Sequence, residues 1–217
     1  DRRVEFIHAS VCALAEDLRA LAARSGAPGG GLIVRHGTAV QCIVQLARSL
    51  GVREVLANRA YEPAALARDR RVADGLAACG IAFSDYKDQV LLEQGEVLNQ
   101  QGQPYSVFTP YKRTWLQKLD AFQTKPYPVE RHAQHLAVPP AGERLPTLAD
   151  LGFVPTNLAD LQLPVGSRGA QQLLQDFLPR MAAYKLARDF PGRKGVSYLS
   201  VHLRFGTVSI RQLASLA

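Results

Sequence analysis

The stretch from residue 38 to residue 86 alternates between helical and extended patterns, and this alternation constrains the fold most. Two segments with apolar residues at helical spacing are each followed by a short apolar run. Helices of this length that alternate with short strands are typical of a parallel α/β sheet. The expected elements are a helix at 4–23, a strand from Leu32, a helix at 38–51, a strand at 52–58, a helix at 63–80 and a strand at 81–86.

The pattern changes after about Gln89. A turn is expected around Gly102, followed by a helix that contains Trp115. Prolines then recur from Thr124 to Pro164 with little periodicity, as in a long linker, and helical spacing resumes at about Ala170. The chain is therefore predicted to contain an α/β unit, a linker and the start of an all-helical unit.

Composition favours a cytoplasmic protein without a membrane partner. No apolar run is long enough to span a bilayer, and the first residues lack the apolar core of a signal peptide. The three cysteines are expected to be small buried hydrophobic residues, because their spacing fits neither a disulfide framework nor a zinc site: Cys12, Cys42 and Cys79. His132 and His135 are interpreted as linker residues, so no metal is predicted.

The net charge of +7 is concentrated near the end of the sequence. Residues 168–217 hold eight Lys or Arg against two acidic residues, whereas the preceding 167 residues are nearly neutral. Such a segment suits a phosphate-rich partner, either a cofactor or nucleic acid. A solvated basic helix face explains the charge equally well, as it does for the four residues at 68–71.

The segment "GRKGVSYLS" (192–200) combines two glycines, two cations and hydroxyl groups just before a helical pattern. Ser197 is expected to cap that helix, and a helix start of this kind binds phosphate or is simply capped. Tyr184 and Arg188 are spaced to share one helix face. The glycines at 26–31 precede an apolar run instead of a helix, so a plain loop is predicted there.

Three segments resemble the DNA photolyase and cryptochrome family, and most of all a bacterial class I cyclobutane pyrimidine dimer photolyase. They are "NRAYEPAALARD", "VFTPYKRTWL" and "YKLARDFPGRKGVSYLSVHLRFGTVSIRQL". The resemblance implies a Rossmann-like parallel-sheet antenna domain at 1–119, a linker at 120–168 and the first helices of an all-α FAD-binding domain at 169–217. The family's first strands and most of its FAD domain are missing, so we expect unpaired strand edges, an open core and a chain that is inactive alone.

The resemblance also assigns residues. It implies FAD as cofactor, with Tyr184 at the flavin, and Arg188 at DNA phosphate. The matching phosphate-binding run consists of Val196, Ser197, Tyr198, Leu199 and Ser200. Val196 and Tyr198 stand where the family commonly has Thr and Arg, which removes one hydroxyl and one cation.

An antenna chromophore of unidentified kind is also implied, with Asn58 and Glu62 as its contacts. The folate-binding members carry an Asn-Glu pair where this chain has Ala64 and Ala65, so folate-type contacts are not matched.

The expected function is light-driven repair of pyrimidine dimers in damaged DNA by electron transfer from reduced FAD, performed by a monomer. No catalytic residue is assigned within these 217 residues. Two alternatives remain open, namely a cryptochrome-like blue-light photoreceptor and a non-flavin nucleotide-binding α/β module with a basic arm.

Overall fold

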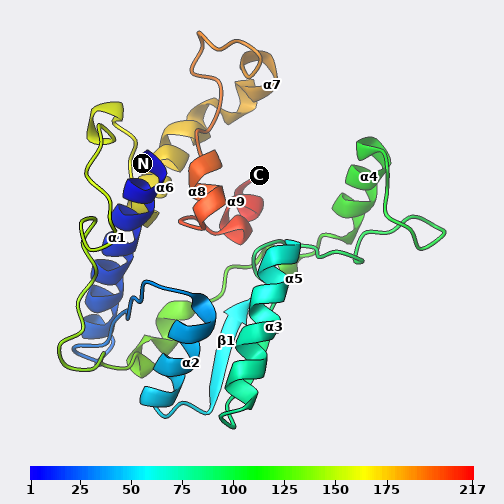
Figure 1. Ribbon diagram of the computed structural model, residues 1–217. Helices are drawn as coiled ribbons and strands as arrows, with labels where there is room; N and C mark the ends of the chain where they lie inside the picture. Colours follow the sequence, from blue (N-terminus) through cyan, green and yellow to red (C-terminus); the bar gives the residue numbers. More distant parts are fainter. The chain divides into compact units, whose positions relative to one another are not determined.

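A computed structural model describes residues 1–217 and contains two compact units (Figure 1). The first unit joins residues 1–34 to residues 127–209, and the second joins residues 35–126 to residues 210–217. Each unit is thus built from segments that are distant in the sequence. The domain boundaries at 119 and 168, inferred from the family resemblance, remain predictions.

The second unit contains the parallel strands that the sequence pattern predicts. Strands β1 and β2 pair in parallel, from Glu54 opposite Ala82 to Asn58 opposite Tyr86. Pro63 occupies the first turn of α3, where its missing N–H is not needed. The elements of this unit are α2 (Ala39–Ser49), β1 (Glu54–Asn58), α3 (Pro63–Ala77), β2 (Ala82–Tyr86), α4 (Phe108–Lys118), α5 (Ala121–Thr124) and α9 (Ile210–Leu216).

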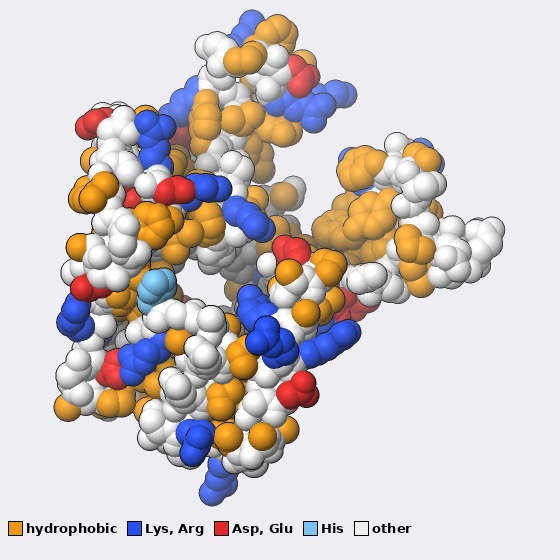
Figure 2. All heavy atoms as spheres, viewed as in Figure 1, with side chains coloured by type: hydrophobic (Ala, Val, Ile, Leu, Met, Phe, Trp, Pro, Cys, Tyr) orange, Lys and Arg blue, Asp and Glu red, His pale blue; other side chains and the backbone are white.

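Helices α2 and α3 pack against each other and against one face of the strand pair. Val72 and Leu76 of α3 are almost fully buried in this core, together with Ile81. The other face is open, because Leu56 of β1 is 63% exposed, and the two-stranded sheet has two outer edges. This agrees with the open core expected from the sequence. Basic side chains gather over α3, as predicted for the solvated face at 68–71 (Figure 2).

The strand predicted from Leu32 does not form. Residues 31–36 belong to no helix or strand, and Gly31 donates its backbone N–H to the carbonyl of Ala137 at 3.2 Å. A strand is stable only when the edge of another strand lies beside it. An apolar pattern therefore could not establish a strand at this position.

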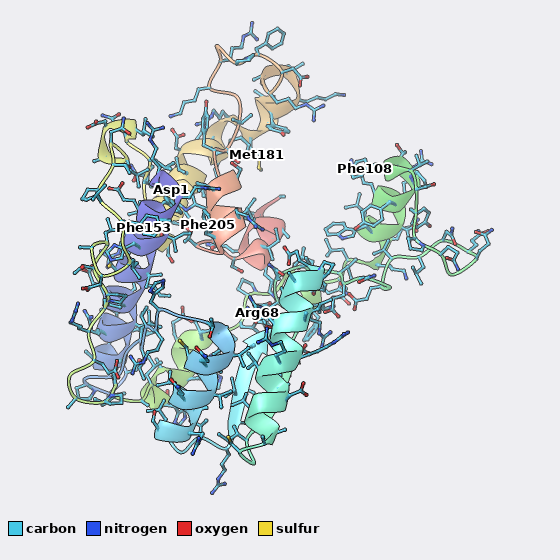
Figure 3. All side chains as sticks on the ribbon, in the orientation of Figure 1. Asp1, Arg68, Phe108, Phe153, Met181 and Phe205 are labelled. Atoms are coloured by element: carbon cyan, nitrogen blue, oxygen red, sulfur yellow. The ribbon has the colours of Figure 1, made fainter.

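The first unit is built around the long helix α1. The Asp1 side chain caps this helix by accepting a hydrogen bond from the Arg3 N–H at 2.8 Å. Phe6 is 2% exposed, and its ring lies 5.8 Å from that of Phe205, which is labelled in Figure 3. The elements of this unit are α1 (Arg2–Arg24), η1 (Val129–His135), η2 (Ala159–Leu161), α6 (Gly166–Phe177), η3 (Leu178–Ala183), α7 (Tyr184–Ala187) and α8 (Ser200–Phe205).

The cysteines differ from the prediction that all three are buried. Cys12 and Cys42 are half-buried, but Cys79 is exposed because it lies in the turn that follows α3. The predicted helix around Trp115 is present as α4, and an isolated antiparallel bridge joins Leu98 to Pro104 around the expected turn. None of the helices has the length and apolar character needed to cross a membrane.

Candidate cofactor site

Residues 192–200, here called the 192–200 loop, turn back directly against the end of α7. A Cβ atom added to Gly195 would lie 2.6 Å from the carbonyl oxygen of Ala187, closer than real side chains come. Gly192 has nothing within 4 Å of the same position. Glycine is therefore required at 195 for close backbone approach, whereas residue 192 has room for a side chain.

The loop leaves several backbone donors free. The N–H groups of Val196, Ser197, Tyr198 and Ser200 have no acceptor within the chain. Tyr198 has a φ of 57°, a left-handed conformation that costs a non-glycine residue roughly 1 kcal/mol. Successive free N–H groups next to a left-handed residue are a backbone arrangement that can bind an anion.

The prediction that Ser197 caps the next helix is wrong. Helix α8 starts at Ser200 with Leu199 in the capping position, and no side chain caps it. The Ser197 hydroxyl instead accepts a hydrogen bond from the Leu199 N–H at 3.4 Å. The left-handed backbone of Tyr198 cannot belong to a right-handed helix, so α8 begins only after this residue.

Asp176 of α6 holds the base of the loop through two cations. Its carboxylate lies 2.8 Å from Lys194 and 2.8 Å from Arg180, which also donates to the carbonyl of Val196 at 3.2 Å. The bonds from Arg180 and then Lys194 lower the pKa of Asp176 below its usual value. The positive charge of Lys194 is thus used within the chain.

The structure brings Tyr184 and Arg188 together, as their spacing predicts. The Arg188 guanidinium lies 5.7 Å from the centre of the Tyr184 ring, a cation–π distance, and both residues are exposed. Both residues lie next to the 192–200 loop, because Gly195 of the loop packs against Ala187, the residue directly before Arg188.

The antenna candidates lie in the second unit, at the carboxyl end of β1. Asn58 and Glu62 are exposed there. Their neighbour Arg59 in the same motif pairs with Asp85 and with Glu93, each at 2.8 Å. These contacts and those of Tyr61 could have been anticipated, because charged residues directly after parallel strands meet at one edge.

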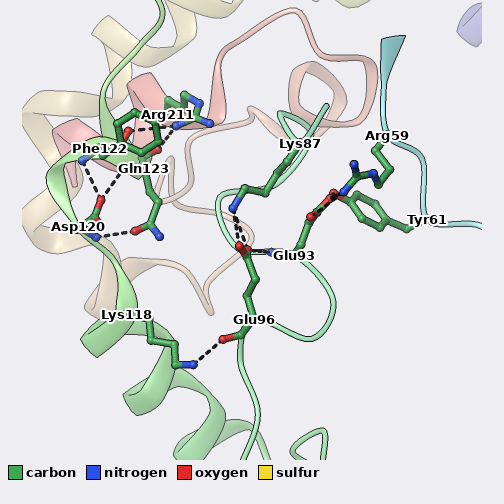
Figure 4. Close-up of polar contacts among 10 residues, drawn as sticks. All are labelled: Arg59, Tyr61, Lys87, Glu93, Glu96, Lys118, Asp120, Phe122, Gln123 and Arg211. Atoms are coloured by element: carbon green, nitrogen blue, oxygen red, sulfur yellow. Dashed lines mark hydrogen bonds and ion pairs between the residues drawn. The ribbon is translucent and has the colours of Figure 1, made fainter. Parts of the chain in front are cut away.

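Two groups of polar contacts occupy this edge of the sheet (Figure 4). The Tyr61 hydroxyl donates to Glu93 at 2.8 Å, and burial, followed by this bond, raises the pKa of Tyr61 to about 12. Lys87 pairs with Glu96 at 2.8 Å, and Lys118 of α4 donates to the Glu96 carbonyl at 2.7 Å. The polar and charged side chains at this edge are therefore already bonded within the chain.

Comparison with known sequences identifies the family. The family model described as DNA photolyase matches residues 1–140. A deoxyribodipyrimidine photo-lyase of Halobacterium salinarum is 34% identical over 214 residues, covering 96% of this chain and 42% of the relative. A 31.6 kDa uncharacterized protein of Synechococcus is 37% identical and covers 84% of this chain and 63% of the relative. This chain spans about two-fifths of the length of the photolyases that it matches.

Comparison with solved structures leads to the same fold family. A class III photolyase from Agrobacterium tumefaciens matches with a TM-score of 0.80 and 27% identity, over 97% of this chain and 42% of that one. A cryptochrome of Synechocystis, at 17% identity and a TM-score of 0.65, supports the fold alone, over 91% of this chain and 44% of that one. The small parallel sheet and the helices of this chain thus have the arrangement of the photolyase and cryptochrome fold. The chain belongs to the DNA photolyase family.

Proposed function

We propose that this chain is the N-terminal part of a light-driven photolyase that repairs cyclobutane pyrimidine dimers in DNA with reduced FAD. The observation that carries the proposal is the 192–200 loop, with its four free N–H groups around a left-handed tyrosine. The relative from Halobacterium salinarum, a photolyase by name, is similar to the chain over a length that includes this loop.

The residues of the loop fit the phosphates of FAD. The N–H groups of Val196, Ser197, Tyr198 and Ser200 would donate to phosphate oxygens, and the backbone of Leu199 completes the run. Because Val196 and Tyr198 replace a hydroxyl and a cation common in the family, backbone donors and the two serine hydroxyls carry more of the binding. When bound and reduced, FAD supplies the light-excited electron that splits the dimer.

Tyr184 is proposed to contact the flavin, and Arg188 to contact DNA phosphate. Arg188 is half exposed, and its ion pair with Asp189 at 3.6 Å is loose. The net charge of +6 over residues 168–217 supports a polyanion partner for this part of the chain.

An antenna chromophore is proposed at the carboxyl edge of the sheet, near Asn58 and Glu62. The alanines at 64 and 65 argue against folate-type contacts. Removal of Asn58 or Glu62 would then lower energy transfer to the flavin without lowering FAD content.

The decisive experiment uses the complete gene product, chemically reduced and mixed with an oligonucleotide that carries one thymine dimer. Samples are divided between blue light and darkness. Dimer loss in the lit sample alone supports the proposed repair. A flavin spectrum without dimer loss favours the cryptochrome alternative, to which the 29% identity with Cryptochrome-1 of Arabidopsis thaliana also points.

The absence of flavin from the complete gene product would contradict the proposal and favour the nucleotide-binding module. The isolated 217-residue chain is expected neither to bind FAD tightly nor to repair dimers. Stoichiometric flavin on the isolated chain would contradict that expectation.

A further inference from the structure

His202, in α8, is a titratable side chain in the core of the first unit. It is 0% exposed, and its ring lies 5.5 Å from the ring of Phe6 in α1, in an edge-to-face arrangement. Phe205, three residues further along α8, lies 5.8 Å from the same ring. Two side chains on one face of α8 therefore hold this short helix against α1.

The two ring nitrogens of His202 have different surroundings. Nδ1 lies 2.6 Å from the Thr207 hydroxyl, whereas Nε2 is buried and forms no hydrogen bond of normal geometry. A charged imidazole ring carries a proton on each nitrogen, so a charged His202 would leave one donor unpaired in the core. The surroundings of the ring therefore suit its neutral form.

The groups that the structure places at the ring are uncharged, namely Phe6, Thr207 and the backbone of Pro164. Burial lowers the pKa of His202 below its usual value, and the backbone of Pro164 offsets only part of this effect. The charged and titratable side chains of the neighbouring elements bond other partners or are exposed: Arg2, Glu5 and His8 of α1, Arg168 of α6 and Arg204 of α8.

The turn that contains His202 continues directly from the 192–200 loop. Ser200 ends the loop and begins α8. Leu199 is 4% exposed, and its carbonyl accepts a hydrogen bond from the Leu203 N–H at 2.8 Å. The loop, α8, Phe6 and Thr207 all belong to the first unit. A displacement of α8 from α1 therefore changes the path of the loop backbone that carries the free N–H groups.

We propose that His202 is a positioning residue whose neutral ring holds α8 against α1, and with it the 192–200 loop in the form that binds FAD. This inference rests on the proposed function. His202 acts through the backbone of α8 and does not contact the cofactor. By linkage, FAD bound at the loop favours the neutral ring, and protonation of the ring weakens FAD binding by the same factor.

The direction of the pH dependence follows from the burial of the ring. Because the pKa of His202 is lower in the folded protein than in the unfolded chain, its contribution is complete above pH ~6.5 and is lost as the pH falls below that value. The carboxylates of this unit titrate below this range, since the pKa values of Glu5 and Asp176 are lowered further from an ordinary value of about 4.

The test is FAD titration of the complete gene product at about pH 7.5 and about pH 5.5. The wild type is expected to lose affinity severalfold, and at most ~10-fold, because even an unshifted histidine gives only tenfold per pH unit below its pKa. His202→Phe keeps a ring against Phe6 but cannot be protonated, so its affinity should be nearly the same at both pH values. His132→Gln, at an exposed histidine of η1 in the same unit, is the control and should keep the wild-type pH dependence.

The pH dependence separates this inference from a purely structural role, which would lower the affinity of His202→Phe equally at both pH values without removing the pH dependence. If His202→Phe does not fold, His202→Gln is the second neutral variant, with the same expected result. A wild-type affinity that is equal at both pH values would overturn the inference, as would either His202 variant with the wild-type pH dependence. Wild-type protein that binds no FAD at about pH 7.5 would overturn the proposed function itself, together with the inference that rests on it.

Discussion

The 192–200 loop and the carboxyl edge of the sheet both carry charged and polar groups, but they use them differently. At the edge, the charged side chains of Arg59, Lys87 and Glu96 are bonded within the chain. In the loop, Lys194 is bonded at the base, while the backbone donors of residues 196–198 have no partner.

We infer from this difference that the loop has donors to offer a ligand, whereas the bonded charges of the edge mainly stabilise the fold. A polar group whose partner is already present gains little from a ligand, whereas a free donor in a fixed geometry gains a full hydrogen bond. The close packing of Gly195 and the left-handed Tyr198 fix the backbone of the loop, which is the geometry that the proposed phosphate site requires. The edge instead links the turns that follow β1 and β2.

The largest effect is expected when the loop is displaced from α7. Gly195→Ala places a Cβ against the Ala187 carbonyl, and overpacking of this kind costs roughly 1–3 kcal/mol, or about 10-fold in FAD affinity. Gly192→Ala is the matched control, because its Cβ meets open space. FAD titration of the complete gene product with each substitution measures the difference, and equal affinities would mean that the close approach at Gly195 does not shape the site.

A smaller effect is expected at the sheet edge. Tyr61→Phe removes the hydrogen bond to Glu93 and should lower the free energy of unfolding by about 1 kcal/mol, with FAD affinity unchanged. Tyr86→Phe, at an exposed tyrosine of β2, is the control. Denaturant unfolding compares the three proteins. A loss of FAD affinity in Tyr61→Phe would show that the edge takes part in binding and would break the comparison.

Arg188 tests whether an exposed cation next to the loop faces DNA. If it contacts one phosphate, Arg188→Ala weakens binding severalfold and reduces the slope of log affinity against log salt by about 0.9. Arg188→Lys should keep most of that slope, and Arg71→Ala on α3 should leave it unchanged. Titration of an oligonucleotide at several salt concentrations gives the slopes. An unchanged slope in Arg188→Ala would remove this residue from the interface.

The smallest effect concerns pH and the edge. The hydrogen bond from Lys87, followed by that from the Glu93 N–H, lowers the pKa of Glu96 in the folded protein. Its contribution is therefore complete above the unfolded pKa of about 4.3 and is lost as the pH falls through the lowered folded value. Glu96→Gln should reduce the melting temperature at pH 7, and this difference should shrink toward pH 3. The control Glu16→Gln, at an exposed position on α1, should change little at either pH.

The fold could be predicted where its pattern is local. The periodicities at 38–51 and 63–80 correspond to α2 and α3, and the two apolar runs after them form β1 and β2. The run at Leu32 has the same apolar character but forms no strand. Pairing with a neighbouring strand is not encoded in a local pattern, which is why this prediction was wrong.

The candidate site was predicted in part. The spacing of Tyr184 and Arg188 correctly predicts their contact, and the glycines of the 192–200 loop indicate a tight turn. The left-handed conformation of Tyr198 and the resulting start of α8 at Ser200 could not be read from the residue types, because tyrosine rarely adopts that conformation.

The sequence by itself determined the order of helices and strands, the concentration of basic residues after position 168 and the motifs that identify the family. Only the tertiary structure decided which charges are bonded and which donors are free. Arg211 illustrates this, since its partners Asp88 and Gln123 lie roughly 90 to 120 residues away in the chain. Burial and pairing depend on which distant segments come into contact on folding, and a local pattern of residues does not specify those contacts.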